Sequence, residues 1–208
     1  MTEDAFVAVQ RPIFISADVG SPTLKGSAIK VEDGFDISGG GADIWGARDE
    51  FQFLYLEQDG DFDMRAQVTS LTFADLYTKA GLMARETLDE GARHVYFQIF
   101  PDNSPRNNNN GGYEYQYRDA AKGEMKAIYP ATSTGEPPFP VAFPETWLRL
   151  VRVGNDFTGY FSSDGIGWRV YAAFELALPQ SVLLGMAVTS HNPGALALAT
   201  YRQVSLAS

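Results

Sequence analysis

Polar side chains recur at every second position in three segments of the chain, residues 77–86, 94–100 and 113–118. This period of two predicts a β-strand in each segment. Because the side chains of a strand alternate between its two faces, three neighbouring strands with their apolar faces on a core would gather these polar groups on one outer face. That face would carry Lys79, Arg85, His94, Tyr96, Gln98, Glu114, Gln116 and Arg118.

Such a face has the chemical groups that sugar binding needs. Planar amides and guanidinium groups form paired hydrogen bonds with hydroxyls, and aromatic rings cover the apolar face of a sugar. The cations Lys79, Arg85 and Arg118 would also suit a carboxylate or sulfate on that sugar. We therefore predict a solvent-accessible face on which Arg85 or Arg118 can be replaced by alanine without unfolding. The alternative is an ordinary solvated sheet face, where Arg–Glu pairs are common.

Two further segments each allow two interpretations. Asp43 and Trp45 follow a glycine-rich turn at residues 39–41. Trp45 could lie at the rim of a groove, with Asp43 accepting a hydrogen bond from a ligand hydroxyl. Equally, Trp45 could be buried while Asp43 caps backbone N–H groups or pairs with Lys79 or Arg85. His191 is either a ligand contact or an ordinary histidine beside the turn-forming Asn192.

Catalytic signals are weaker. Glu57, Asp59 and Asp61 alternate, and on a strand they would share a face, as the carboxylates of some glycosidases do. Gly60 and its polar neighbours instead predict a turn, which argues against that role. The run also lacks the glycine and glutamate spacing of an EF-hand. With two histidines and no cysteine, the chain favours neither a zinc site nor a thiol nucleophile, and disulfides are excluded.

The polar segments belong to a strand-and-turn pattern that runs through the 208 residues. Turn residues are frequent, helical periodicity is almost absent, and no linker interrupts the pattern. These features predict an all-β sandwich of two antiparallel sheets, forming a single domain over residues 1–208. The expected strands are 6–10, 13–17, 28–32, 34–38, 50–56, 62–70, 77–86, 94–100, 113–118, 125–129, 147–153, 156–162, 168–176, 181–189 and 198–206.

Charge and hydropathy narrow the range of partners. Lys and Arg number 16 against 26 Asp and Glu, a net charge of −10, which argues against nucleic acid or an anionic membrane. No apolar run approaches the roughly 18 residues of a membrane span, so we expect no membrane insertion. The first residues, Met-Thr-Glu-Asp, have neither the basic nor the apolar region of a signal peptide. The compartment therefore stays open.

Several segments, in their order along the chain, carry a family resemblance. They are residues 18–22 (Asp-Val-Gly-Ser-Pro), 40–46 (Gly-Gly-Ala-Asp-Ile-Trp-Gly), 49–51, 79–86 (Lys-Ala-Gly-Leu-Met-Ala-Arg-Glu), 147–152, 162–165 with Trp168, and 190–192. The chain resembles the concanavalin A-like lectin/glucanase superfamily, and within it functionally unassigned bacterial modules related to the C-terminal sandwich of some β-xylosidases. The resemblance covers about residues 17–206 and implies an extracellular jelly roll with one concave and one convex sheet. Tyr77 departs from it, because a tryptophan is expected there.

The resemblance implies a carbohydrate partner and leaves room for a structural calcium held with Asp18 or Asp43. The favoured function is a non-catalytic carbohydrate-binding module, without a cofactor, for an oligosaccharide or polysaccharide that is either neutral or acidic. The expected ligand contacts on the concave face are Trp45, Lys79, Arg85, Tyr96, Gln98, Glu114, Gln116, Arg118 and His191. The alternatives are a glycan-active hydrolase or lyase on the same groove, or a structural, self-assembling extracellular domain.

Overall fold

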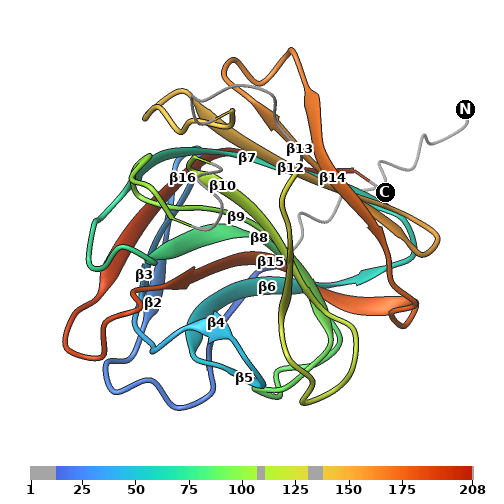
Figure 1. The fold of residues 1–208 in the computed structure, drawn as a ribbon, viewed down its shortest axis with the longest axis horizontal. Helices are drawn as coiled ribbons and strands as arrows, with labels where there is room; N and C mark the ends of the chain where they lie inside the picture. Colours follow the sequence, from blue (N-terminus) through green and yellow to red (C-terminus); the bar gives the residue numbers. More distant parts are fainter. Residues whose placement is uncertain (1–12, 107–110, 131–137, 208) are drawn as a thin grey trace, which may run out of the picture.

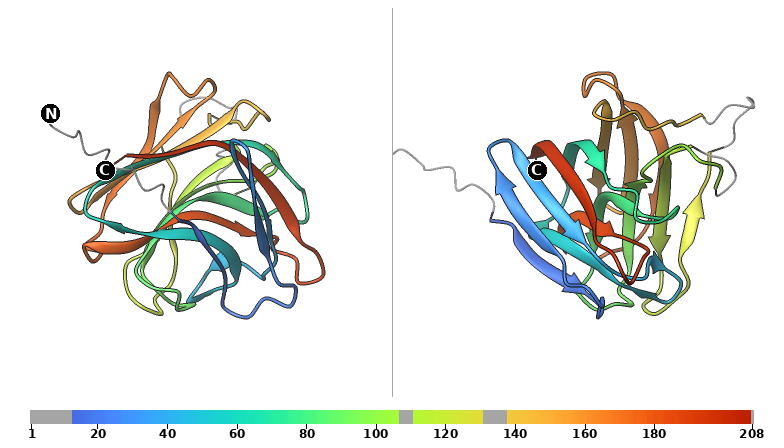
Figure 2. Two further views of the ribbon diagram at one scale, coloured as in Figure 1. Left: turned by 180° about the vertical axis from the view of Figure 1, so that it is seen from behind. Right: turned by 90° about the vertical axis from the view of Figure 1, so that its left-hand side faces the viewer.

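The computed structural model describes residues 13–106, 111–130 and 138–207. Within these ranges all the regular structure is β, and the strands form two large antiparallel sheets packed face to face (Figures 1 and 2). The predicted all-β sandwich is therefore confirmed. The expected strand at residues 6–10 lies outside the described residues.

Each sheet combines strands from distant parts of the chain. Sheet 1 contains, in spatial order, β1 (Ile15–Val19), β6 (Phe51–Asp59), β15 (Ser181–Thr189), β8 (Lys79–Arg85), β9 (His94–Ile99), β10 (Tyr113–Arg118) and β11 (Lys126–Ile128). Sheet 2 contains β14 (Arg169–Glu175), β13 (Asp156–Ser162), β12 (Thr146–Val153), β7 (Phe62–Leu71), β16 (Ala197–Ala207), β3 (Gly34–Gly39) and β2 (Ser27–Val31). Early and late strands thus lie side by side in both layers (Figure 1).

The core lies between the sheets and follows the predicted alternation. Ala80, Leu82, Val95 and Phe97 are fully buried in it. Close packing is visible at Gly159 on β13, where an added Cβ would come within 2.9 Å of ring atoms of Phe97. Strands β8, β9 and β10 are hydrogen-bonded neighbours in sheet 1. The polar set from the sequence therefore does gather on the face of sheet 1 that points away from the core.

The expected strands that the structure describes are present, with ends shifted by up to three residues. One boundary matters for function, since β6 continues to Asp59 and the turn begins only at Gly60, which has a φ of 69°. The prediction of a turn over residues 57–61 is therefore wrong for Glu57 and Asp59. Asp61 does lie in the turn and accepts a hydrogen bond of 2.7 Å from the Gly154 backbone N–H.

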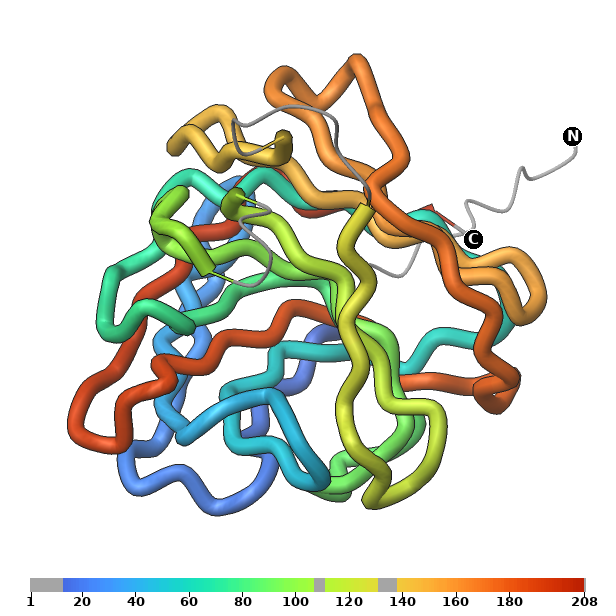
Figure 3. The backbone as a smooth tube through the Cα atoms, viewed as in Figure 1, coloured from blue at the N-terminus to red at the C-terminus, as the bar shows by residue number. Residues whose placement is uncertain are grey.

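Two short strands were missed, and they cover part of the polar face. β4 (Ile44–Trp45) and β5 (Arg48–Asp49) form a hairpin, which we call the cover hairpin. It lies over β6 in Figures 1 and 3, where the segment near residue 45 is light blue. Ile44 is fully buried in a second apolar cluster, separate from the main core. Its other members are Val19, Phe51, Phe53, Tyr55, Met83, Tyr96 and Ala187.

The other end of the cover hairpin is held by charge. Asp49 is fully buried, and its two carboxylate oxygens each accept a 2.7 Å hydrogen bond from the guanidinium group of Arg118. Arg85 donates to the same carboxylate at 3.3 Å. Other N–H groups of the two arginines donate to the backbone carbonyls of Gly46, Thr87, Asp89, Ala92 and Gly123. We call this arrangement the Asp49 clamp.

The Asp49 clamp keeps its charges despite burial. Burial lowers the pKa of Arg85 to about 10, which still leaves the group protonated at neutral pH. Burial acts to raise the pKa of Asp49, but its charged and hydrogen-bonding neighbours, Arg118 and Arg85 among them, outweigh it and hold that pKa below the ordinary value. The prediction that Arg85 and Arg118 face solvent is therefore wrong, because both are 0% exposed and bind Asp49.

Removing the central carboxylate should destabilise the protein strongly. In Asp49→Ala, two buried guanidinium groups lose their counter-charge, which costs about 3–5 kcal/mol in the free energy of unfolding. For a chain of this size, thermal unfolding should shift down by roughly 6–20 °C. The matched control is Arg48→Ala on the same hairpin, whose side chain is 61% exposed and pairs with Glu50 and Glu90. A shift no larger than that of the control would contradict the structural role of Asp49.

Candidate functional site

The polar face of sheet 1 stays open beside the cover hairpin, in a pocket of about 280 Å³. Its lining residues come from four parts of the chain. They are Asp43 and Trp45 from the cover hairpin, Tyr77 and Lys79 at the start of β8, Gln116 on β10, and His191 just after β15. We call it the hairpin pocket. The sheet supplies its floor and the hairpin supplies one wall.

Aromatic side chains form the accessible part of the hairpin pocket. Trp45 is 42% exposed, so the interpretation that places it at a groove rim is the one the structure matches. Tyr77 packs edge-on against Phe100, with ring centroids 6.2 Å apart, and lies 5.4 Å from the His191 ring. A flat apolar surface therefore stands next to polar groups, as in sites that bind amphipathic ligands.

Ionic contacts link the two sides of the hairpin pocket. Lys79 Nζ donates to Asp43 Oδ1 and, at 3.3 Å, to the Ile44 carbonyl. His191 Nε2 lies 3.3 Å from Asp43 Oδ2, and its Nδ1 lies 2.9 Å from Asp75 Oδ1. The contact with Asp43 is the main reason why the pKa of His191 is raised. Asp43 therefore joins the hairpin to both β8 and the end of β15.

His191 also has an unusual backbone. Its φ is 54°, in the left-handed region, which is uncommon for residues other than glycine and is concentrated at functional sites. The following turn is held by Asn192, whose Oδ1 accepts from the Gly194 N–H at 3.0 Å. The turn-forming part of the sequence interpretation is thus confirmed, while the imidazole points to the pocket lining rather than away from it.

A buried carboxylate fixes the orientation of the pocket amides. Glu114 Oε1 accepts hydrogen bonds from the Nε2 groups of Gln98, at 3.1 Å, and Gln116. Glu114 Oε2 accepts from the Tyr129 hydroxyl at 2.8 Å. Because each amide donates from its NH₂ group to Glu114, its carbonyl oxygen faces away from that side chain. Among the described residues, neither Gln98 Oε1 nor Gln116 Oε1 has a hydrogen-bond partner.

The nine residues expected to contact ligand fall into three groups. Trp45, Lys79, Gln116 and His191 line the hairpin pocket, and for these residues ligand contact stays a prediction. The expectation that Gln98 and Glu114 contact a ligand is wrong, because both side chains are fully buried, and Glu114 accepts hydrogen bonds from Gln98 and Gln116.

The third group, Arg85, Arg118 and Tyr96, has no exposed surface. The two arginines belong to the Asp49 clamp. Tyr96 lies in the apolar cluster under Ile44 and donates its hydroxyl to the Ala187 carbonyl at 3.0 Å. The expectation that these three side chains face a ligand is therefore wrong, because the cover hairpin occupies that part of the face.

Asp43 and Tyr77 complete the pocket lining and were not among the nine. For Tyr77 a signal existed, because it shares the alternation of Lys79 and Arg85 and so belongs to the same face. For Asp43 the sequence already offered pairing with Lys79 as one alternative, and the structure shows that pair.

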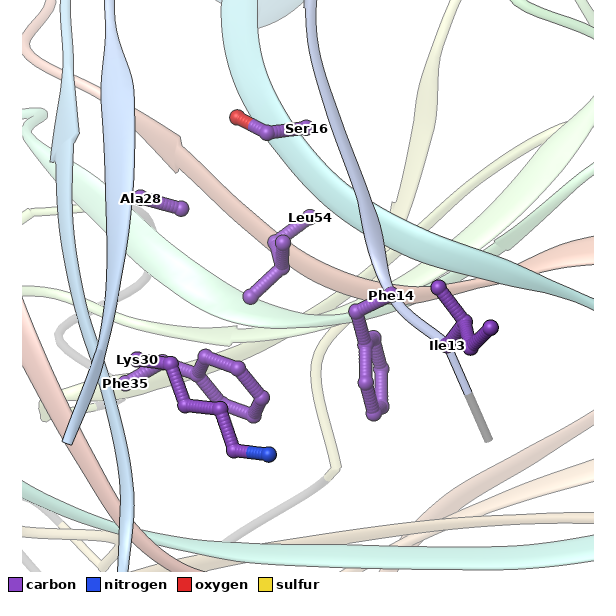
Figure 4. A pocket seen from close by; sticks show the side chains of 7 residues that line it. All are labelled: Ile13, Phe14, Ser16, Ala28, Lys30, Phe35 and Leu54. Carbon is purple, nitrogen blue, oxygen red and sulfur yellow. The ribbon is translucent and has the colours of Figure 1, made fainter. Parts of the chain in front are cut away.

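The described residues contain no cluster of three or more His, Asp or Glu side chains suited to a metal. A hollow of about 360 Å³ lies beside strands β1 and β2 (Figure 4). It is lined mainly by apolar side chains, including Phe14 and Phe35, whose ring centroids are 5.1 Å apart. Among the described residues that line it, Lys30 is the only charged one, so this part of the hollow lacks the convergent polar groups of the hairpin pocket.

Comparison with known proteins supports the fold. No protein-family model matches the chain, and no curated protein matches its sequence. A functionally unknown protein from Saccharomyces cerevisiae is 16% identical with a TM-score of 0.68, covering 93% of this chain and 96% of that one. The carbohydrate-binding module CBM66 from Bacillus subtilis is 14% identical with a TM-score of 0.56, covering 93% and 95%.

A third similar structure is a longer protein, of which the match covers only part. The GH43 protein BlXynB from Bacillus licheniformis is 11% identical with a TM-score of 0.60, and the match covers 93% of this chain but 39% of that one. At these identities the comparisons establish a shared jelly-roll sandwich.

None of the described residues forms a helix that could cross a membrane.

The two histidines should titrate in opposite directions. The pKa of His191 is raised, first by its contact with Asp43, so its imidazole resonances should titrate above pH 6.5. Burial lowers the pKa of His94 to about 3, so its resonances should not move between pH 5 and 8. NMR titration of wild type and His191→Asn assigns the two signals. A single signal titrating near pH 6.5 in His191→Asn would contradict the burial of His94.

The same shifts set the pH dependence of stability. The contribution of His191 is present in full below the unfolded pKa of about 6.5 and is lost as pH rises through its higher folded pKa. His94 has the opposite effect on stability. Its pKa is higher in the unfolded chain than in the folded protein, so as pH falls the unfolded chain binds a proton before the folded protein does. The free energy of unfolding should therefore fall through His94 as pH drops from about 6.5 toward 3. Urea unfolding of His94→Gln between pH 4 and 7 should lose this part of the pH dependence.

Proposed function

We propose that this chain is a concanavalin A-like, non-catalytic carbohydrate-binding domain whose ligand occupies the hairpin pocket. The observation that carries the proposal is the combination of an exposed Trp45 with a buried amide, Gln116, whose carbonyl oxygen has no partner among the described residues. A sugar presents both an apolar face of C–H groups and a rim of hydroxyls. The aromatic rings of Trp45 and Tyr77 suit the C–H face. The hydroxyls are suited by the polar groups of Gln116, Asp43 and His191.

The same sandwich fold occurs in a carbohydrate-binding module, CBM66. The likeness shows the fold alone, so the argument rests on the pocket. The strained backbone of His191 and the buried amides indicate a lining that is already in place before a ligand arrives, as binding sites usually are.

The alternatives have less support from the lining residues. Glycoside hydrolysis needs two carboxyl groups across the scissile bond, one as acid and one as base or nucleophile. Asp43 already pairs with Lys79 and His191, and Glu114 accepts hydrogen bonds from Gln98, Gln116 and Tyr129. These partners hold both side chains in fixed positions. A catalytic acid or base must instead exchange a proton with substrate.

Affinity should be modest, because the hairpin pocket is small and open. We expect dissociation constants from micromolar to millimolar, about −4 to −8 kcal/mol. A glycan array with purified protein identifies the sugar, followed by titration calorimetry with the best ligand. We expect the same binding pattern with calcium and with chelator, because the described residues lack a carboxylate cluster for the ion. If no glycan on the array binds, the alternative of a structural, self-assembling domain is favoured.

Trp45→Ala should weaken sugar binding about tenfold, because the aromatic surface for the sugar is lost. The fold should persist, since Trp45 is 42% exposed. The matched control is Tyr160→Ala, an aromatic residue on β13 of sheet 2 that contacts Arg149, and its affinity should equal that of wild type.

Equal affinities for Trp45→Ala and wild type would rule out the hairpin pocket as the site. Hydrolysis or elimination of a polysaccharide that disappears in Glu114→Gln would establish the enzyme alternative instead.

A further inference from the structure

We propose that the hairpin pocket selects an uncharged sugar, which it binds through the hydrogens of the sugar hydroxyls, and that it discriminates against carboxylated and sulfated sugars. This inference rests on the proposed function and adds the class of ligand. It replaces the expectation of a partner that is either neutral or acidic. Three independent features of the described residues lead to it.

The first feature is that the cations of this face are already paired. Lys79, 2% exposed, donates to Asp43 and to the Ile44 carbonyl. Arg85 and Arg118 are fully buried and bind Asp49. Of these three cations Lys79 is the one that lines the pocket, and an anionic sugar would have to displace Asp43 to pair with it. From the sequence, these three positive charges suggested an acidic ligand. In the structure they are already paired and are therefore not available to bind one.

The second feature is an acceptor that needs a donor. Gln116 is 1% exposed, lines the pocket, and has its Oε1 without a partner among the described residues. Glu114 fixes that orientation, because Gln116 Nε2 donates to Glu114 Oε1 and the amide oxygen therefore points elsewhere. A ligand hydroxyl that reaches this buried oxygen can donate to it. A carboxylate or sulfate has no hydrogen to donate and would place one acceptor against another.

The third feature is the sign of the local charge. Among the described residues at the pocket, the carboxylates of Asp43 and Asp75 pair with Lys79 and His191, so the charge of the rest of the chain decides the sign. The whole chain carries a net charge of −10. An anion approaching this pocket is therefore repelled. A cationic sugar gains little in return, since Asp43 is paired with Lys79 and His191, and Glu114 is hydrogen-bonded to Gln98, Gln116 and Tyr129.

The test compares oligosaccharides of equal length and linkage that differ in one group, namely a neutral hexose series, its C6-carboxylate form and its C2-amino form. We begin with the backbone that binds best on a glycan array containing all three classes and sulfated glycans. Calorimetry should give an affinity for the neutral form at least tenfold higher than for the acid form. Raising NaCl from 50 to 500 mM should leave the neutral affinity unchanged, because no net charge is exchanged.

Two variants probe the mechanism. Gln116→Met removes the acceptor at nearly the same volume and should lower the neutral affinity about tenfold, whereas Gln67→Met, on β7 of sheet 2, should not change it. Asp43→Asn releases Lys79 and should raise affinity for the acid form relative to the neutral form. This second variant leaves the Glu114–Gln116 contact in place, so it tests charge selection even if Gln116→Met does not fold.

The outcomes separate the inference from the proposed function. Preference of wild type for acid or amino sugars would overturn the inference while leaving a carbohydrate-binding domain. An unchanged acid-to-neutral ratio in Asp43→Asn would show that Lys79 pairing does not exclude acids, and this would also overturn it. Absence of binding to every glycan class would overturn the proposed function and, with it, the inference.

Discussion

A single buried carboxylate sets the architecture of the functional face. Asp49 binds Arg118 through both oxygens and also contacts Arg85, and all three side chains are excluded from solvent. Buried charges are tolerated only when paired and hydrogen-bonded. Because Asp49 belongs to the cover hairpin while the arginines belong to β8 and β10, satisfying these charges requires the hairpin to lie on sheet 1.

The position of the hairpin then determines which part of the polar face stays open. Under Ile44 the face is apolar and closed, with Tyr96 and Met83 packed beneath it. Beyond Trp45 the face is open, and there the hairpin brings Asp43 to Lys79 and His191. The same hairpin thus neutralises the cations of the sheet and forms one wall of the hairpin pocket. The resulting pocket lining, as far as the structure describes it, consists of hydrogen-bond acceptors, aromatic surface and cations that are already paired.

The strands and their faces could be predicted from the sequence because a two-residue period repeats over five to ten positions. Alternation placed Ala80, Leu82 and Val95 in the core and Lys79, Gln98 and Gln116 on the opposite face, as the structure has them. The cover hairpin could not be found in this way, since strands of two residues have no period. The burial of Arg118 depends on Asp49, 69 positions away, and alternation says nothing about a layer added on top of a face.

The central claim is that the Asp49 clamp holds the cover hairpin against sheet 1. Amide hydrogen exchange of Asp49→Asn and wild type, under conditions where both are folded, tests it most directly. The hairpin is tied by backbone hydrogen bonds from Asp49 to Glu90, at 2.8 Å, and from Glu50 to Asp43, at 2.7 Å. The account predicts faster exchange at residues 43–50 in the variant, with protection of β12 and β16 unchanged. Equal protection of residues 43–50 in the two proteins would contradict it.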